Sequence, residues 1–585
     1  MNQFIRNIGG NCRRAVLFSM TMPFLMMVVL TLAPQSAGAE NILLQGGTLI
    51  DGTGKPPQVN ANILIEGNVI SKVWTGDAGA VPLLPPGTIA IDIRGKFVIP
   101  GLIDSHVHYR PYMGELFLAY GVTTVNDLGD PLYWLEATKR GLNSGKIRGP
   151  RFYFCGDIGG TDGSTAEENL PTIEKRVLVT MKSPADAKQA VAQVKQSADC
   201  IKLREDTRGE YFTALGREAD AQGISIIAHS LDARDSIRWG IDGIEHMVGI
   251  GFATMTSPEG RKIFEGKHIE AGHKNSTLYQ WMDPSAFDPL IADLLKNNVY
   301  INPTLHFEWK GINPRTREHE LEDTRLLNNP QLQYVPLDER LVTLGQYHWA
   351  DEKSSTEKEQ YGKGYRRVQE FLSRFVKAGG KIYSGTDSAA ATTPGLSIHQ
   401  EMELLVDAGL TPMQALLSST KWSAEILRLQ NQLGTIEDGK LADLVILDAN
   451  PLQDIRNTKR INKVIQNGAI ADITFHSDYQ FPFPRYGGET KHLYNPSPQM
   501  RDAHPPVTVE GQEVIIKITG RGFVPSSVVT FAGAPIATKF VSATELQITL
   551  SPLHTARAGT YSLIVSSPKP GGGETVPVPF IVNFR

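Results

Sequence analysis

Four histidines and one aspartate stand at or near the ends of short apolar runs, where β-strands would display them. His106 and His108 end the run 98–108. Because alternate residues of a strand face the same side, both imidazoles can reach one metal ion. His229, His246 and Asp387 hold matching places in three later runs. Such a set suits zinc, with manganese, iron or cobalt as alternatives. Any one of these histidines could be a hydrogen-bonded core residue, but together the five residues predict a metal centre.

A lysine, Lys202, occupies the corresponding position in a further apolar run, CIKLRED (200–206). Burial and neighbouring cations both disfavour an ammonium group, so a lysine beside divalent metals loses its proton readily. The neutral amine can take up carbon dioxide and become a carbamate, an anionic ligand able to bridge two metals. A solvent-facing lysine, or a salt bridge with Glu205 or Asp206, explains the spacing equally well. The residues alone therefore leave the role of Lys202 open.

The apolar runs that carry these residues alternate with helical patterns. Helical periodicity is clear in 184–198 and 397–409, for example. Strands that alternate with helices indicate a parallel sheet, and eight of them predict an α/β fold with a (β/α)8 TIM-like barrel. The expected strands are 98–108, 123–128, 151–156, 200–205, 224–230, 243–247, 299–305 and 381–387.

The segments on either side of the barrel are rich in short strands and turns. We assign 98–433 to the barrel and expect 40–97 and 434–478 to meet as one small β-sandwich beside it. Residues 479–504 are rich in proline and read as a linker. Short alternating strands in 505–585 then predict a second, C-terminal β-sandwich.

The segments between the last three barrel strands, 248–380, are unusually long. Loops that follow barrel strands lie on the catalytic face, so these segments can cap the site. Extra surface helices whose aromatic residues pack inwards are an equal alternative. The aromatic residues in question are Tyr279, Trp281, Phe307, Trp309, Tyr347 and Trp349.

The first 39 residues predict a secretory signal peptide. Three arginines precede an apolar run over 15–33, and the small residues 36–39 offer a cleavage site near Ala39. The run is close to membrane-spanning length, so an uncleaved anchor is the alternative. With cleavage, we expect a periplasmic or secreted protein that is not held at the membrane.

Charge and cysteine content restrict the remaining function classes. Without residues 1–39 the chain has 55 basic and 62 acidic residues, which argues against binding to nucleic acid. Cys155 and Cys200 are too few for a disulfide framework. They fall in neighbouring expected strands, where a bridge is feasible, but we expect two buried thiols.

Several motifs resemble the amidohydrolase superfamily, and its prolidase-like and imidazolonepropionase-like branch in particular. The resemblance covers about 41–475. The C-terminal region, 505–585, resembles an IPT/TIG domain through ITGRGFVPSSVVTFAG and SATELQITL, which implies a sandwich of immunoglobulin-like type. The amidohydrolase motifs are VIPGLIDSHVH, YGVTTVNDLGD, CIKLRED, IIAHSLDARDSIRWGIDGIEHM, GTDS and LGTIEDGKLADLVILDANPLQDI.

The resemblance implies a binuclear centre, most simply with two zinc ions. His106, His108 and Asp387 would bind the first ion, His229 and His246 the second, and carboxylated Lys202 would bridge them. A metal-activated hydroxide would then attack the carbonyl of an amide substrate, such as a dipeptide, an N-acyl amino acid or a cyclic amide. Asp387 would pass the proton of the water to the leaving nitrogen.

Two other functions remain open, as does the assembly. One is a deaminase or cyclic-imide hydrolase that uses a single metal and an uncarboxylated Lys202. The other is a non-catalytic secreted binding protein, against which the complete ligand set argues. The sequence leaves open whether the chain forms a homo-oligomer and whether the C-terminal domain has a ligand.

Overall fold

The computed structural model describes residues 41–76, 83–159, 177–203, 211–265, 276–389, 391–482, 498–568 and 573–585. The expected signal peptide lies outside these residues, as do Glu205 and Asp206. In the part of the chain that is described, no helix combines the length and apolar character needed to cross a membrane.

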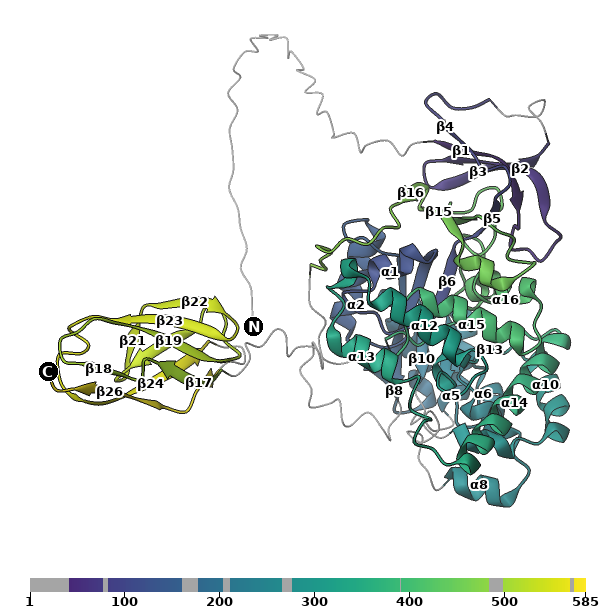
Figure 1. Cartoon of the computed structure of the whole chain (residues 1–585). Helices are drawn as coiled ribbons and strands as arrows, with labels where there is room; N and C mark the ends of the chain where they lie inside the picture. Colours follow the sequence, from purple (N-terminus) through teal and green to yellow (C-terminus); the bar gives the residue numbers. More distant parts are fainter. Residues whose placement is uncertain are drawn as a thin grey trace, which may run out of the picture. The chain divides into compact units, whose positions relative to one another are not determined.

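Parallel strands surrounded by helices form the central domain (Figure 1). Each strand pairs in parallel with the next, in the order expected for a barrel. Every residue of β6 and β7 is buried, as is usual for strands covered on both faces. The strands are β6 (Leu102–Val107), β7 (Val122–Asp127), β8 (Arg151–Gly159), β10 (Cys200–Leu203), β11 (Ser225–His229), β12 (Gly243–Glu245) and β13 (Tyr300–Asn302), with β9 (Val177–Thr180) beside β8.

The expected eighth strand, 381–387, closes the barrel without forming a regular ladder. Single parallel bridges join Ile382 to Ile301 and Ser388 to Val107. Between them the backbone amide of Asp387 donates to the carbonyl oxygen of His106 at 2.8 Å. Asp387 adopts a left-handed backbone conformation, with φ at 53°, which turns the segment out of regular strand geometry. The (β/α)8 fold is therefore confirmed, with an irregular final strand.

Helices follow the strands and cover the outside of the barrel (Figure 1). The expected helices at 184–198 and 397–409 appear as α4 and α15. The helices are α1 (Gly114–Ala119), α2 (Leu132–Asn143), α4 (Ala187–Ser197), α5 (Tyr211–Gln222), α6 (Ala233–Trp239), α7 (Val248–Ala253), α8 (Pro258–Glu265), α10 (Phe287–Lys296), α11 (Leu305–Glu308), α12 (Thr316–Leu327), α13 (Leu337–Gly345), α14 (Ser355–Lys377), α15 (Leu396–Asp407), α16 (Pro412–Ser418) and α17 (Lys421–Ile426).

The longest of these helices, α14, shows how the sequence specifies an element. Ser354 and Glu357 form a capping box: the Ser354 hydroxyl accepts from the Glu357 amide, and the Glu357 carboxylate accepts from the Ser354 amide. Tyr361, Tyr365 and Val368 recur at helical spacing and are buried. The helix therefore packs one apolar face on the barrel. It ends shortly before the segment 381–388, which closes the barrel.

Both ends of the catalytic region join in one small sheet, as expected. The order β16-β15-β14-β5-β1-β2-β3, with β4 beside β1, interleaves strands from before and after the barrel, and these strands share a separate hydrophobic core. The strands are β1 (Ile42–Leu49), β2 (Gln58–Glu66), β3 (Val69–Thr75), β4 (Ile89–Asp92), β5 (Phe97–Pro100), β14 (Leu444–Leu447), β15 (Ile461–Gln466) and β16 (Ala469–Ala471).

The C-terminal residues form two further sheets around their own core, as an immunoglobulin-like sandwich requires. One sheet has the order β17-β19-β23-β22, and the other has the order β18-β26-β24-β20-β21 with β25 beside β24. The strands are β17 (Gln499–His504), β18 (Val507–Val509), β19 (Val514–Arg521), β20 (Val528–Phe531), β21 (Ala534–Ile536), β22 (Thr538–Ser542), β23 (Glu545–Leu550), β24 (Gly559–Ser567), β25 (Gly573–Glu574) and β26 (Val578–Asn583).

The expected linker, 479–504, is shorter in the structure. At its C-terminal end β17 belongs to the second domain. At its N-terminal end the Phe481 ring stacks on Trp134 and lies 6.0 Å from the Tyr109 ring, while the Tyr479 hydroxyl donates to the carbonyl oxygen of Arg148. Both aromatic side chains pack against the barrel, so the catalytic domain extends as far as Phe481.

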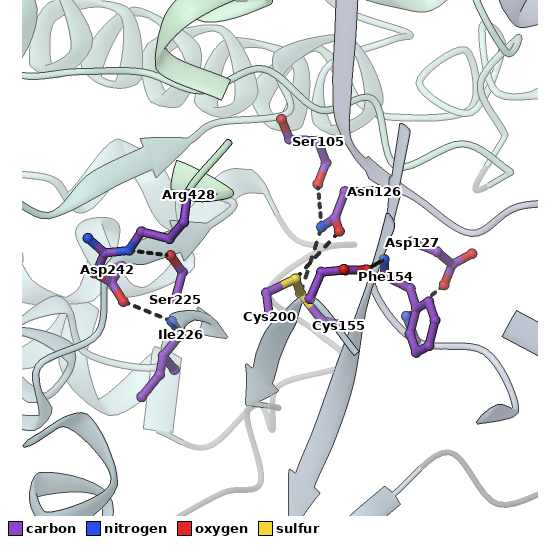
Figure 2. The surroundings of a disulfide bond; sticks show 12 residues. Ser105, Asn126, Asp127, Phe154, Cys155, Cys200, Ser225, Ile226, Asp242 and Arg428 are labelled. Carbon is purple, nitrogen blue, oxygen red and sulfur yellow. Dashed lines mark hydrogen bonds and ion pairs between the residues drawn. A yellow bond between two sulfur atoms is a disulfide. The ribbon is translucent and has the colours of Figure 1, made fainter. Parts of the chain in front are cut away.

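Cys155 and Cys200 form a disulfide, and the expectation of two free thiols is wrong (Figure 2). The two residues are register partners on adjacent strands β8 and β10, which brings their Cα atoms to 4.3 Å. Asn126 on β7 lies beside the bridge and donates to the carbonyl oxygen of Ser105. The bridge therefore joins two barrel strands at a point two residues before Lys202.

We expect the double variant Cys155→Ala, Cys200→Ala to lose about 2–4 kcal/mol in free energy of unfolding, because the bridge closes a span of 45 residues. Denaturant titration of the oxidised protein and the variant measures this difference. Reduction of the parent protein under denaturing conditions is the control. Two titratable thiols in unfolded, unreduced mature protein would contradict the bridge.

Candidate metal centre

The centre is built where β6 meets the segment that closes the barrel. His106 Nε2 and His108 Nε2 each lie 3.4 Å from Asp387 Oδ1, and His246 Nε2 lies 3.9 Å from Asp387 Oδ2. His229 ends β11, and its ring centroid lies 5.1 Å from that of His246. The strand pairing thus brings together all five residues expected to bind metal.

The five residues form two overlapping groups. In the first, His106, His229 and His246 offer nitrogen atoms within 4.8 Å of one another; in the second, His106, His108 and Asp387 do the same with nitrogen and oxygen atoms. His106 belongs to both. Three imidazoles, or two imidazoles and a carboxylate, are donor sets that fit a divalent transition metal. The residues in both groups therefore fit the divalent metal that the sequence predicts.

Lys202 lies within electrostatic reach of the same centre. It is only 1% exposed and pairs in register with Asp157 on β8 and Ile227 on β11. Its charge acts on His106 and on Glu245. The alternative of a solvent-facing lysine is wrong, since the side chain is buried in the barrel; the alternative partners Glu205 and Asp206 lie outside the described residues.

Two of the candidate ligands have a strained backbone. His246 has φ at 61° and Asp387 at 53°, in the left-handed region that side chains with a Cβ rarely adopt. Backbone hydrogen bonds hold both residues: His246 N donates to Asn302 O at 2.7 Å, and Asp387 N donates to His106 O at 2.8 Å. The surrounding strands thus impose the conformation that turns both side chains to the centre.

Buried carboxylates shape the electrostatics of β6. Burial raises the pKa of Asp104 to about 7, although Thr386 and the His106 amide donate to it. Burial alone would lower the pKa of His106, but Glu245 and Asp387 outweigh burial, and the pKa lies above its ordinary value. Burial also acts to raise the pKa of Glu245, but the neighbouring His106 and Lys202 lower it below its ordinary value.

The long insertion contributes to the wall of the centre. His246 Nδ1 lies 2.7 Å from Thr304 Oγ1 and 3.6 Å from Glu308 Oε1, and the Phe307 ring lies 6.2 Å from the His246 ring. Both expectations for the aromatic residues of 248–380 therefore hold in part. Phe307 borders the centre, while Tyr279, Trp309 and Tyr347 are buried in packing.

Sequence reasoning missed three residues directly behind the ligands. Asn302 and Tyr383 each donate a hydrogen bond to Glu245, and Glu245 contacts His106. A charged residue inside the buried run 243–247 was the available signal for Glu245. Asn302 and Tyr383 carry no such signal, because their role depends on strands far apart in the chain.

A different cavity, of about 380 Å³, lies between α2, the start of β8 and the strand β16 of the small sheet. Arg148, Arg151 and Asp472 line it, together with apolar residues. Arg148 is paired with Glu115 and Arg151 with Asp443, so both cations are neutralised within the protein. None of the candidate ligands lines this cavity.

Comparison with known proteins agrees with both expected families. A family model described as "Amidohydrolase family" matches residues 97–471, and one described as "IPT/TIG domain" matches residues 498–580. The chain is 22% identical over 270 residues to the 5-methylthioadenosine/S-adenosylhomocysteine deaminase of Symbiobacterium thermophilum, which covers 40% of this chain and 58% of the deaminase. It is 41% identical over 70 residues to the dihydroorotase of Citrifermentans bemidjiense, which covers 12% and 15%. The chain thus spans less than two thirds of either relative.

A solved structure of a Xaa-Pro dipeptidase with bound methionine in its active site has a similar fold. Its TM-score is 0.50 with 22% sequence identity, and the match covers 74% of this chain and all of the dipeptidase chain. The two chains therefore share one fold over the whole length of the dipeptidase chain.

We expect His106→Ala to lower the bound metal by at least one ion per chain, because His106 belongs to both ligand groups. His229→Ala and His108→Ala should each impair one group. Elemental analysis of protein produced with zinc measures the bound metal per chain, and His348→Ala, at an exposed histidine, is the control. Well-folded protein without transition metal, or a His106→Ala protein with unchanged content, would contradict the assignment.

Proposed function

Because the chain belongs to the amidohydrolase family, we propose that it hydrolyses a carbon–nitrogen bond in a small amide or peptide with the help of two divalent metal ions. The observation that carries this proposal is the pair of ligand groups that share His106. Together the groups offer five ligand side chains, more than the four donors that a single zinc ion usually takes, and this favours two ions.

The proposed ligands follow from this arrangement. His106, His108 and Asp387 would hold one ion, His229 and His246 the other, and Lys202 would bridge them as a carbamate. Zinc suits these nitrogen and oxygen donors best, with manganese, iron or cobalt as alternatives. Lys202 supports the bridge because its side chain lies on β10, between β8 and β11, where burial disfavours the charged ammonium form.

Divalent ions bound there would lower the pKa of a water molecule and polarise the substrate carbonyl. The protein's own part falls mainly to Asp387. Its Oδ1 faces His106 and His108 and its Oδ2 faces His246, so the carboxylate lies at the middle of the ligand set. We assign it the transfer of a proton from the attacking water to the leaving nitrogen.

Dipeptides and N-acyl amino acids are the substrates we propose first. The similar fold of a Xaa-Pro dipeptidase and the Phe307 ring beside His246 support an apolar side chain next to the scissile bond. We also propose a periplasmic or secreted location, in line with the expected signal peptide. The Cys155–Cys200 bridge supports it, because disulfides persist in oxidising compartments.

The proposal is tested by screening dipeptides, N-acyl amino acids and cyclic amides with protein of known metal content. We expect release of a free amine that stops on chelation and returns with zinc, and no release by His106→Ala. Ammonia release from a purine would instead favour the mononuclear deaminase. Absence of any hydrolysis by fully metallated protein would favour the binding protein.

For the bridge, we expect Lys202→Ala to weaken binding of at least one metal ion and to lower kcat, because the two cations would lose a shared anionic ligand. Short carboxylic acids in the buffer should restore part of the activity. Lys202→Arg should not recover it, since a guanidinium stays protonated. Metal content and kcat are the measurements.

The matched control is Lys381→Ala. Lys381 is the first residue of the segment that closes the barrel. Its Nζ lies 2.8 Å from Glu425 Oε2 and contacts no candidate ligand. This variant should lose some stability and keep both metal ions. Near-normal metal content and kcat in Lys202→Ala would leave the bridge without support and favour a single metal.

A further inference from the structure

Glu245 is a buried carboxylate in the barrel, directly before the candidate ligand His246 and outside both ligand groups. It is 1% exposed. Burying a carboxylate costs free energy unless hydrogen bonds and charges compensate for it. Its partners come from three other strands of the barrel, so the compensation depends on the closed fold.

All three partners are placed to donate. His106 Nδ1 lies 2.5 Å from Glu245 Oε2, Asn302 Nδ2 donates to the same oxygen at 2.7 Å, and the Tyr383 hydroxyl donates to Oε1 at 2.8 Å. The orientation of the Asn302 amide follows from a further contact, because its Oδ1 accepts from Gly385 N at 3.1 Å. A carboxylate with three donors acts as an acceptor at each contact, which places the ring proton of His106 on Nδ1.

Two glycines make room for this arrangement. A Cβ atom at Gly385 would lie 2.3 Å from His106 Cβ and 2.6 Å from Asn302 Nδ2. A Cβ atom at Gly243 would lie 2.6 Å from the Tyr383 hydroxyl oxygen. Both contacts are far too short, so the backbone here is shaped around the donors of Glu245.

We propose that Glu245 is a positioning residue that fixes the His106 tautomer and thereby makes Nε2 the nitrogen that binds metal. His106 Nε2 faces Asp387, whereas Nδ1 faces Glu245, so the ring spans from the carboxylate to the ligand set. A carboxylate behind a metal-binding histidine holds the ring, sets its tautomer and increases its basicity. Because His106 is shared, one carboxylate acts on both ligand groups.

The inference rests on the proposed function, since it requires a metal at His106. It is tested on the full chain by the dissociation constant for zinc, measured by competition with a chelating dye. We expect Glu245→Gln to weaken zinc binding about 10–100-fold, because the amide presents one acceptor and one donor to three donors. Tyr383→Phe, which removes a single donor and keeps the ring, should weaken it less.

The matched control is Glu425→Gln at the other end of the barrel. Glu425 Oε2 likewise accepts from a tyrosine, Tyr300, and from Lys381, but it contacts no candidate ligand. Thermal unfolding of the metal-free proteins reports the structural cost of each change. We expect Glu425→Gln to lose stability with unchanged zinc affinity, and Glu245→Gln to lose affinity beyond any loss of stability.

A second readout is independent of activity. In metal-free protein labelled with ¹⁵N-histidine, the His106 signals should report a proton on Nδ1, and Tyr383→Phe should retain it while Glu245→Gln should not. A proton on Nε2 with none on Nδ1 in the parent protein, or unchanged zinc affinity in both Glu245→Gln and Tyr383→Phe, would overturn the inference. A parent protein that binds no zinc would instead refute the proposed function.

Discussion

The contact between β6 and the segment 381–388 is the constraint on which the centre depends. Ser105 N donates to Ser384 O, and Asp387 N donates to His106 O. The hydrogen bonds that close the barrel are therefore also those that bring Asp387 to the histidines. The two partners of each bond lie far apart in the sequence, so the contact depends on the fold of the barrel strands between them. The centre therefore combines residues that only the closure of the barrel brings together.

The clustering of the candidate ligands was predictable from the sequence because a strand converts sequence spacing directly into geometry. His106 and His108 share a face through their spacing of two, and His229 and Asp387 stand where an apolar run stops. Strand ends in a barrel lie on one face, so position along each run was sufficient. The fold followed from the same alternation of apolar runs and helical patterns.

Other features depend on which strand lies beside which, and the sequence does not state this with equal clarity. Asn302 is the register partner of Glu245 on the adjacent strand β13, and Tyr383 comes from the segment beside β13; they lie 57 and 138 residues from Glu245 along the chain. The Cys155–Cys200 bridge depends on register: neighbouring strands were foreseen, but the alignment of these two residues opposite one another was not. The irregular eighth strand likewise reflects left-handed backbone at Asp387, which a pattern of apolar residues does not reveal.

The packing of Phe481 has a mechanical consequence. The Phe481 ring stacks on Trp134 and lies 6.0 Å from the Tyr109 ring. Tyr109 directly follows His108 in the sequence. A pull on the C-terminal domain therefore reaches the catalytic domain first at this aromatic cluster, before it reaches the strands of the small sheet. The cluster is thus the point at which a load on that domain enters, one residue away from the candidate ligand His108.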